Sequence, residues 1–150
     1  MNHRLATIAA TIGLLALSAM GATGQVAPRN YDFGTVTQVT QIEVKPGQLN
    51  AYMQDLASGW RNAMEAGKRA GAILSYGVEQ PLDPRPGEAN LVLVVVFKSL
   101  AAFDRPLADA EKSAATQYGS LDKAHDMAMQ RETMRKVLGT EVYRQLAFTR

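Results

Sequence analysis

The sequence predicts an α+β fold in which a four-stranded antiparallel sheet carries two helices on one face. Three observations predict it. Apolar residues alternate over residues 36–44 and then recur every three or four positions from Gln48 onward, across a turn at Pro46-Gly47. Residues 91–97 (LVLVVVF) are apolar throughout, as in a central strand that is covered on both faces. The predicted elements follow the order strand, helix, strand, strand, helix, strand, which is the split βαβ arrangement of a ferredoxin-like sandwich.

Residues 1–24 are predicted to be a signal peptide rather than part of this fold. Arg4 supplies a positive charge ahead of the apolar stretch 5–19 (LATIAATIGLLALSA), which is short for a membrane span. The small residues at 20–24 suit cleavage by signal peptidase. We therefore expect a periplasmic or secreted protein with no membrane association after cleavage. An uncleaved amphipathic anchor is the alternative.

The composition limits the chemistry available to the rest of the chain. The sequence has 16 Lys and Arg against 14 Asp and Glu, so the loss of Arg4 leaves 15 basic residues against 14 acidic ones. No basic cluster of the kind that binds nucleic acid stands out. The sequence contains no Cys, which excludes disulfides, thiol nucleophiles and iron–sulfur ligation. Hydrophobic packing must therefore hold the domain together.

The first half of the domain is predicted to begin with a strand and a long helix. Residues 25–35 show no periodicity and are expected to form an N-terminal arm, so that the domain spans 36–150 and opens with strand 36–44. A left-handed glycine at Gly67 or Gly71 would end the helix that starts at Gln48. The helix carries one apolar stripe, formed by Leu49, Tyr52, Met53, Leu56, Trp60, Ala63 and Met64.

Two further strands follow the helix. Residues 73–80 alternate, with Leu74, Tyr76 and Val78 predicted to share the face toward the helices. Three prolines make residues 81–88 a loop, after which the apolar run forms the third strand. Ser99 is placed to cap a short helical segment after that strand.

The last third of the chain is predicted to hold one more helix and one more strand. Residues 105–119 are weakly helical in pattern. A looser apolar stripe predicts a helix over 121–138 that ends at Gly139. Residues 141–148 (EVYRQLAF) form the last predicted strand.

A sheet with both helices on one face leaves its other face uncovered. Because the run 91–97 is apolar on both sides, something must cover that second face. A second copy of the chain is the simplest cover, since two such sheets can pack face to face in a symmetric dimer. The expected partner is therefore the chain itself.

Three stretches of the sequence resemble a known superfamily. "IEVKPGQLNAYMQDLASGW", "VVVFKSLAAFD" and "TEVYRQLAF" are similar to segments of the dimeric α/β-barrel superfamily, which includes antibiotic-biosynthesis-monooxygenase-like, EthD-like and NIPSNAP-like proteins. The likeness covers about two thirds of the predicted mature chain and points to an exported member. It implies a ferredoxin-like subunit and a homodimer that closes into a barrel. It does not imply one reaction, because the superfamily holds cofactor-free oxygenases, haem enzymes and proteins without a known reaction.

The strand alternation also predicts candidate ligand-binding residues. If Ile42 and Val44 face the helices, Gln41 and Glu43 face the interior of the dimer. By the same alternation Ser75 and Glu79 point that way, and a few polar groups in an apolar wall form a reasonable small-molecule site. The full set of candidate ligand-binding residues is Gln41, Glu43, Ser75, Glu79, Trp60, Tyr143 and Arg144.

Two of the candidates carry a possible catalytic role. Glu43 could act as a general base if desolvation raises its pKa, and Tyr76 is the other candidate to handle a substrate proton. The alternative is that Glu43 and Glu79 lie on a solvated strand or pair with Arg144. Trp60 falls in the middle of the helix stripe, so it either packs in the core or grips an aromatic ligand.

His125 is the single histidine outside the predicted signal, since His3 lies within it. It is the only imidazole that could bind haem, although its charged neighbours favour an exposed position on a helix. Copper binding would use His125 and Met129, which share a helix face from which Met127 points away. No catalytic set, metal site or cofactor is predicted from these residues.

Three functions remain open at this point. The first is an exported homodimer that binds a small apolar or aromatic molecule. The second is a cofactor-independent oxygenase or isomerase that acts on a small aromatic or carbonyl compound through Glu43 or Tyr76. The third is haem binding through His125.

Overall fold

The computed structural model describes residues 28–149, so the predicted signal peptide and residues 25–27 of the arm lie outside the described residues. The elements in chain order are β1 (Tyr31–Val44), α1 (Leu49–Asp55), a π-helical turn (Leu56–Trp60), α2 (Arg61–Arg69), β2 (Ile73–Glu79), β3 (Leu91–Phe97), a 3₁₀ turn (Leu100–Phe103), α3 (Leu107–Tyr118), α4 (Leu121–Met134) and β4 (Arg135–Phe148).

The strands lie in the order β2-β3-β1-β4, each antiparallel to its neighbour, which confirms the predicted ferredoxin-like α+β fold. Within residues 28–149, no helix has the length and apolar character that crossing a membrane requires.

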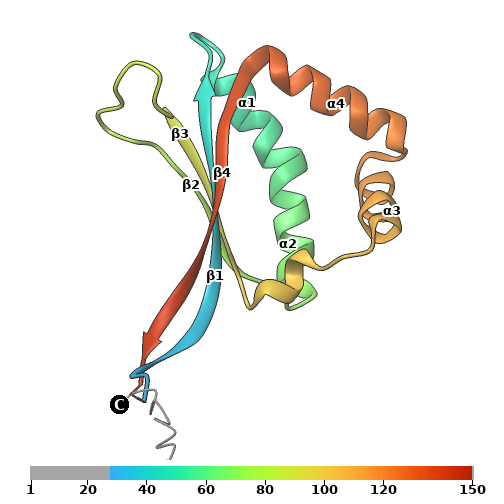
Figure 1. The fold of residues 1–150 in the computed structure, drawn as a ribbon. Coiled ribbons are helices and arrows are strands. Elements are labelled where there is room, and N and C mark those ends of the chain that lie inside the picture. The colour runs from blue at the N-terminus through green and yellow to red at the C-terminus, as the bar shows by residue number, and fades with distance from the viewer. Residues whose placement is uncertain (1–27, 150) are drawn as a thin grey trace, which may run out of the picture.

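All helices lie on one side of the sheet. Figure 1 shows the sheet nearly edge-on, with α1 to α4 on this helix side and only the β2–β3 loop reaching across the other, open side. The core lies between β1, β3 and α1, where the buried side chains pack together: Ile42, Val44, Tyr52, Leu56, Leu91 and Leu93. Ile42 pairs with Leu91 and Thr40 with Leu93, so the even-numbered residues of β1 from Val36 to Val44 face the helices. The odd-numbered residues within 37–43 therefore belong to the open side.

The turn at Pro46-Gly47 joins β1 to α1 as predicted. Gly47 has a φ of +76°, which glycine adopts without steric cost. The Gln48 amide donates a 3.0 Å hydrogen bond to the Lys45 carbonyl, and α1 begins at the next residue. At the other end, Gly71 rather than Gly67 takes the left-handed conformation, with a φ of +72°.

The β1 and β4 strands are both longer than predicted. β1 begins at Tyr31 instead of Val36, because residues of the expected arm pair with the end of β4. The predicted helix over 121–138 is wrong at its C-terminal end: α4 stops at Met134, and β4 begins at Arg135 opposite Val44. Pairing with β1 therefore overrides the helical pattern, and Gly139 lies within a strand instead of capping a helix.

Two smaller expectations differ from the structure. A β-bulge between Ile73 and Ser75 turns Ile73 into the core and leaves Leu74 half-exposed, so the prediction that Leu74 faces the helices was wrong. The Ser99 side chain makes no capping hydrogen bond to the 3₁₀ turn. The weak pattern over 105–119 does form a helix, α3.

Candidate functional site

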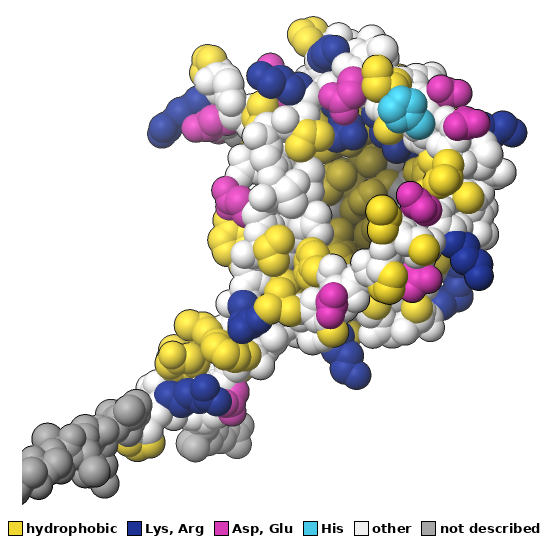
Figure 2. Space-filling model, turned by 45° about the vertical axis from the view of Figure 1, so that its right-hand side comes forward, with side chains coloured by type: hydrophobic (Ala, Val, Ile, Leu, Met, Phe, Trp, Pro, Cys, Tyr) yellow, Lys and Arg dark blue, Asp and Glu magenta, His cyan; other side chains and the backbone are white. Residues whose placement is uncertain are grey.

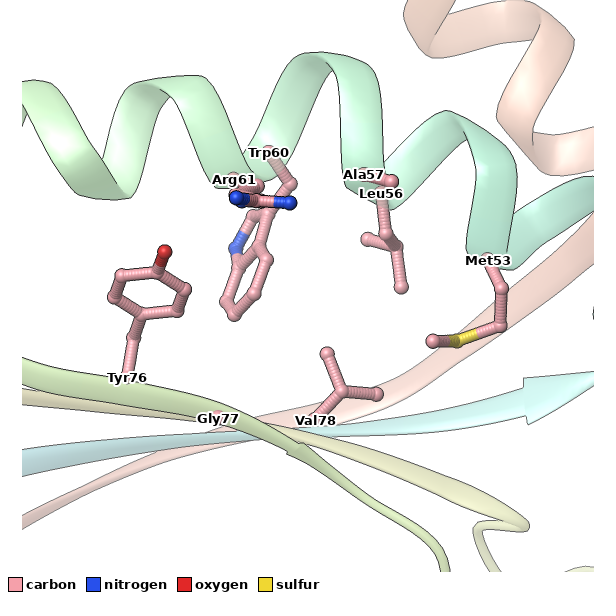
Figure 3. Close-up of a pocket in the computed structure, with 8 residues that line it drawn as sticks. All are labelled: Met53, Leu56, Ala57, Trp60, Arg61, Tyr76, Gly77 and Val78. Atoms are coloured by element: carbon pink, nitrogen blue, oxygen red, sulfur yellow. The ribbon is translucent and has the colours of Figure 1, made fainter.

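A pocket opens between the first helical segment and the edge strand β2. Figure 3 shows it from the side, with side chains of the π-helical turn above and those of β2 below. We call it the π-turn pocket; it encloses about 170 Å³. Its lining is almost wholly apolar, as in sites that hold small hydrophobic ligands. The lining residues are Met53, Leu56, Ala57, Trp60, Arg61, Tyr76, Gly77 and Val78.

Two aromatic rings shape one end of this pocket. The centroids of Trp60 and Tyr76 lie 5.3 Å apart, and their planes are inclined at 89°. This edge-to-face arrangement is favourable in its own right and leaves both rings half-buried at the wall of the cavity. Trp60 therefore combines the two roles considered for it, since it packs against the core cluster and also lines the pocket.

The Tyr76 hydroxyl is held by a carboxylate. It donates a 2.5 Å hydrogen bond to Glu65 Oε1 of α2, and the Lys68 ammonium lies 5.7 Å from the centre of the Tyr76 ring. The hydrogen bond to Glu65 raises the pKa of Tyr76 and lowers the pKa of Glu65. A raised pKa disfavours the phenolate, so Tyr76 is not suited to removing a proton. Its single hydroxyl proton is donated to Glu65, so the oxygen can only accept a hydrogen bond from a ligand.

The roof of the pocket is an irregular helical turn. Residues Leu56–Trp60 form a single π-helical turn between α1 and α2, a distortion that often occurs at functional sites. The turn is braced from outside by the end of α3, where Gln117 Nε2 donates a 2.9 Å hydrogen bond to the Gly59 carbonyl. A Cβ on Gly59 would lie 3.2 Å from Arg131 Nη2 and 3.3 Å from the Tyr118 hydroxyl, so a side chain here would push these two groups away by a few tenths of an ångström. No signal in the sequence indicated the π-helical turn.

Most of the other candidate residues lie on the opposite, open side of the sheet. The register places Gln41, Glu43, Ser75, Glu79 and Tyr143 there. Gln41 Nε2 donates a 3.3 Å hydrogen bond to Glu141 on β4, which also accepts a hydrogen bond from the Tyr143 hydroxyl. Glu141, which was not among the predicted residues, thus joins two of them in a small polar network.

The two candidate catalytic residues do not come together. Glu43 lies on the open side, directly across from Lys136 in β4, whereas Tyr76 faces the helices. Within one chain they cannot act on the same substrate. Arg144 stacks over the Phe33 ring, with its Cζ 4.5 Å from the ring centre, and among residues 28–149 it forms no ion pair with Glu43 or Glu79.

His125 lies exposed on α4, as does Met129. In the described part of the chain, no group of three or more histidine or acidic side chains is arranged to hold a metal ion.

Solved structures with the same fold share little sequence with this chain. A dimeric ferredoxin-like protein from an uncultured marine organism has a TM-score of 0.50 and 8% identity, over 79% of this chain and 91% of that chain. HapK from Hahella chejuensis has a TM-score of 0.47 and 18% identity, over 74% of this chain and 92% of that chain. A second dimeric ferredoxin-like protein from an uncultured marine organism has a TM-score of 0.45 and 13% identity, over 79% of this chain and 99% of that chain. No protein-family profile and no curated protein sequence matches the chain.

The first of these similarities agrees with the strand order seen here. At 8% identity it bears on the fold alone. The chain has the ferredoxin-like α+β fold, and the fold expected from the resemblance to the dimeric α/β-barrel superfamily is confirmed.

Proposed function

We propose that this protein is a homodimer that binds a small aromatic molecule in the π-turn pocket. The observation that carries the ligand class is the pair of half-buried rings, Trp60 and Tyr76, at the wall of an apolar cavity. A flat aromatic ligand can stack or pack edge-on against such rings. The Tyr76 hydroxyl, kept protonated by Glu65, is the polar group that can orient it.

The ligand proposal is tested with 2-naphthol, a neutral two-ring probe. Trp60 is the single tryptophan of the chain, so its fluorescence reports directly on the pocket. Bound 2-naphthol should quench that fluorescence by energy transfer. Ala57→Phe fills the pocket and should weaken binding by at least ~10-fold, whereas Ala108→Phe on the exposed surface of α3 should leave it unchanged. Equal binding by the two variants, measured by calorimetry, contradicts the proposed site.

The open side of the sheet supports the dimer. Val92, Val94 and Val96 of β3 lie there beside Val39 of β1, and no helix of residues 28–149 covers them. Half-buried valines on one face form an apolar strip that a second copy can bury. The solved structure with a TM-score of 0.50 is described as dimeric, which agrees with this proposal.

A charge at the centre of the valine strip tests the dimer. Val94→Lys places an ammonium group there and should produce a monomer in sedimentation velocity at micromolar concentration. The matched control is Leu82→Lys, because Leu82 is fully exposed in the β2–β3 loop. A monomeric wild-type protein, or a Val94→Lys variant that stays dimeric, rules out this interface.

Export is part of the same proposal. Residues 1–24 have the charge and apolar length of a cleaved signal peptide. Expression of the full sequence in a Gram-negative host should yield a periplasmic protein whose mass lacks those residues. Recovery of the intact chain in the cytoplasm contradicts export.

A further inference from the structure

A second concavity lies on the helix side, away from the π-turn pocket. Figure 2 shows a deep hollow with a hydrophobic floor and Lys or Arg side chains near its upper end. It exists because α3 packs on α4 and not on the sheet. The first helical segment covers β2, β3 and the Ile42–Val44 end of β1, whereas the part of β4 around Thr140 and Val142 is left without a helix over it.

The sheet wall of this hollow carries both polar and apolar side chains. The register places Gln38 and Thr40 of β1, with Thr140 and Val142 of β4, on the helix side. The hydroxyls of Thr40 and Thr140 are 3.3 Å apart and share a hydrogen bond. Val142 remains 49% exposed although it faces the helices, which shows that this part of the wall is open.

Arg135 supplies a buried charge at the end of β4 where α4 joins it. Its side chain is 15% exposed, and its Cζ lies 5.5 Å from the centre of the buried Tyr52 ring. Its Nε is buried and has no hydrogen-bond partner among residues 28–149. Its ion pair with Glu132 is 3.5 Å long, and the Glu132 side chain is 54% exposed. An arginine that is this buried and this poorly paired is costly, because a donor without an acceptor loses its hydration.

The neighbouring Arg131 is hydrogen-bonded more completely than Arg135. Its Nε and Nη2 both donate hydrogen bonds within the protein, to Asp55 and to Tyr118. Two nitrogens of Arg131 are therefore engaged in structure, whereas Arg135 Nε has no acceptor among residues 28–149.

We propose that the hollow binds an amphipathic organic anion, with its carboxylate on Arg135 and its apolar body on the hydrophobic floor. A carboxylate forms charge-assisted hydrogen bonds with guanidinium nitrogens, and the 15% of the Arg135 side chain that stays exposed is the part that it can reach. The apolar body removes hydrophobic surface of the hollow from water. This site is separate from the π-turn pocket and does not depend on the function proposed for it.

The test compares dodecanoate with dodecan-1-ol, both below their aggregation limits, by calorimetry at pH 7.5. The wild type should bind dodecanoate at least ~10-fold more tightly than the alcohol, as expected for a charge-assisted hydrogen bond. Arg135→Gln should abolish the preference and leave the affinity for the alcohol unchanged. Arg85→Gln is the matched control, because Arg85 is exposed in the β2–β3 loop, away from the hollow, and should not affect either ligand.

Two further variants keep the proposal open to refutation if Arg135→Gln does not fold. Arg135→Lys keeps the charge and should retain a preference for the carboxylate. Val142→Trp narrows the hollow and should weaken the binding of both ligands. Equal affinity of the wild type for dodecanoate and dodecan-1-ol, or an equal loss in Arg85→Gln, overturns the proposal. Displacement of 2-naphthol by dodecanoate also overturns it, since that result places the anion in the π-turn pocket.

Discussion

Arg131 of α4 donates a 2.7 Å hydrogen bond from its Nε to Asp55 Oδ2 at the end of α1. The two side chains are only 16% and 9% exposed, so this ion pair is largely shielded from water. The Arg131 Nη2 also donates a 2.9 Å hydrogen bond to the hydroxyl of Tyr118, the last residue of α3. One guanidinium thus joins α1, α3 and α4, and it holds the α3–α4 pair to the body of the domain.

Removal of either charge should destabilise the fold strongly. Asp55→Ala or Arg131→Met alone leaves the other charge buried without a partner, which costs about 3 kcal/mol of unfolding free energy. The double variant Asp55→Ala/Arg131→Met should cost clearly less than the sum of the two single changes, because it leaves no unpaired charge. Urea denaturation measures all three values. If the double variant loses as much unfolding free energy as the two single variants together, the two charges are not coupled.

The hydrogen bond between Tyr76 and Glu65 predicts a stability effect with two pH limits. The lowered pKa of Glu65 means that its contribution is complete above the ordinary value of 4.5 and is lost as the pH falls through the folded-state value. The raised pKa of Tyr76 means that its contribution is complete below 10.0 and is lost as the pH rises through the folded-state value. The difference in melting temperature between wild type and Tyr76→Phe should therefore be constant from about pH 6 to 9 and shrink on both sides. A difference in melting temperature that does not change at acid pH contradicts a hydrogen bond from Tyr76 to the ionised Glu65 carboxylate.

Gly67→Ala should not give the increase in unfolding free energy that this substitution usually gives within a helix. A Cβ at this position would lie 2.5 Å from Ile73 Cδ1, and Ile73 is buried. Gly67→Ala should therefore lose the gain of roughly 0.5–1 kcal/mol that the substitution normally gives in a helix, and it should be neutral or destabilising. In an Ile73→Val background, which removes Cδ1 and leaves Cγ1 3.0 Å from the added Cβ, the same change should cost less. Denaturant titration of the four proteins checks this reduction.

Gly71 should be intolerant of a side chain for a different reason. Its φ of +72° costs a residue with a Cβ about 1–2 kcal/mol, so Gly71→Ala should lower the unfolding free energy by that amount. Gly139→Ala is the control, because Gly139 has an ordinary φ and nothing within 4 Å of the added Cβ. A comparable loss in both variants shows that backbone strain is not the cause.

The sequence predicts the elements better than it predicts their ends. Alternation over 36–44, the apolar run 91–97 and the Pro46-Gly47 turn are local signals, and each corresponds to a local structure. The error at 135–138 arose because nothing within that segment opposes a helix. Its conversion to strand depends on pairing with residues 42–44, almost a hundred positions away.

The site was predictable only in part, for the same reason. Trp60 was recognised as a candidate because an aromatic residue on a helix stripe can face a ligand as well as a core. The Glu65–Tyr76 hydrogen bond and the bracing of Gly59 depend on distances between elements, which no residue pattern carries. Arg135 was missed because its burial follows from the unexpected start of β4.

The paired ends of β1 and β4 have a practical consequence. Past the last β3 contact at Val36, the two strands continue as a ribbon in which Tyr31 lies opposite Phe148, and Figure 1 shows it leaving the body of the domain. Asn30 accepts a 2.9 Å hydrogen bond from the Thr149 amide, so both ends of the described chain meet at the ribbon tip. The described chain therefore enters and leaves the domain at one place, and a tag or tether joined near Thr149 would be attached at the ribbon tip instead of at the body of the domain.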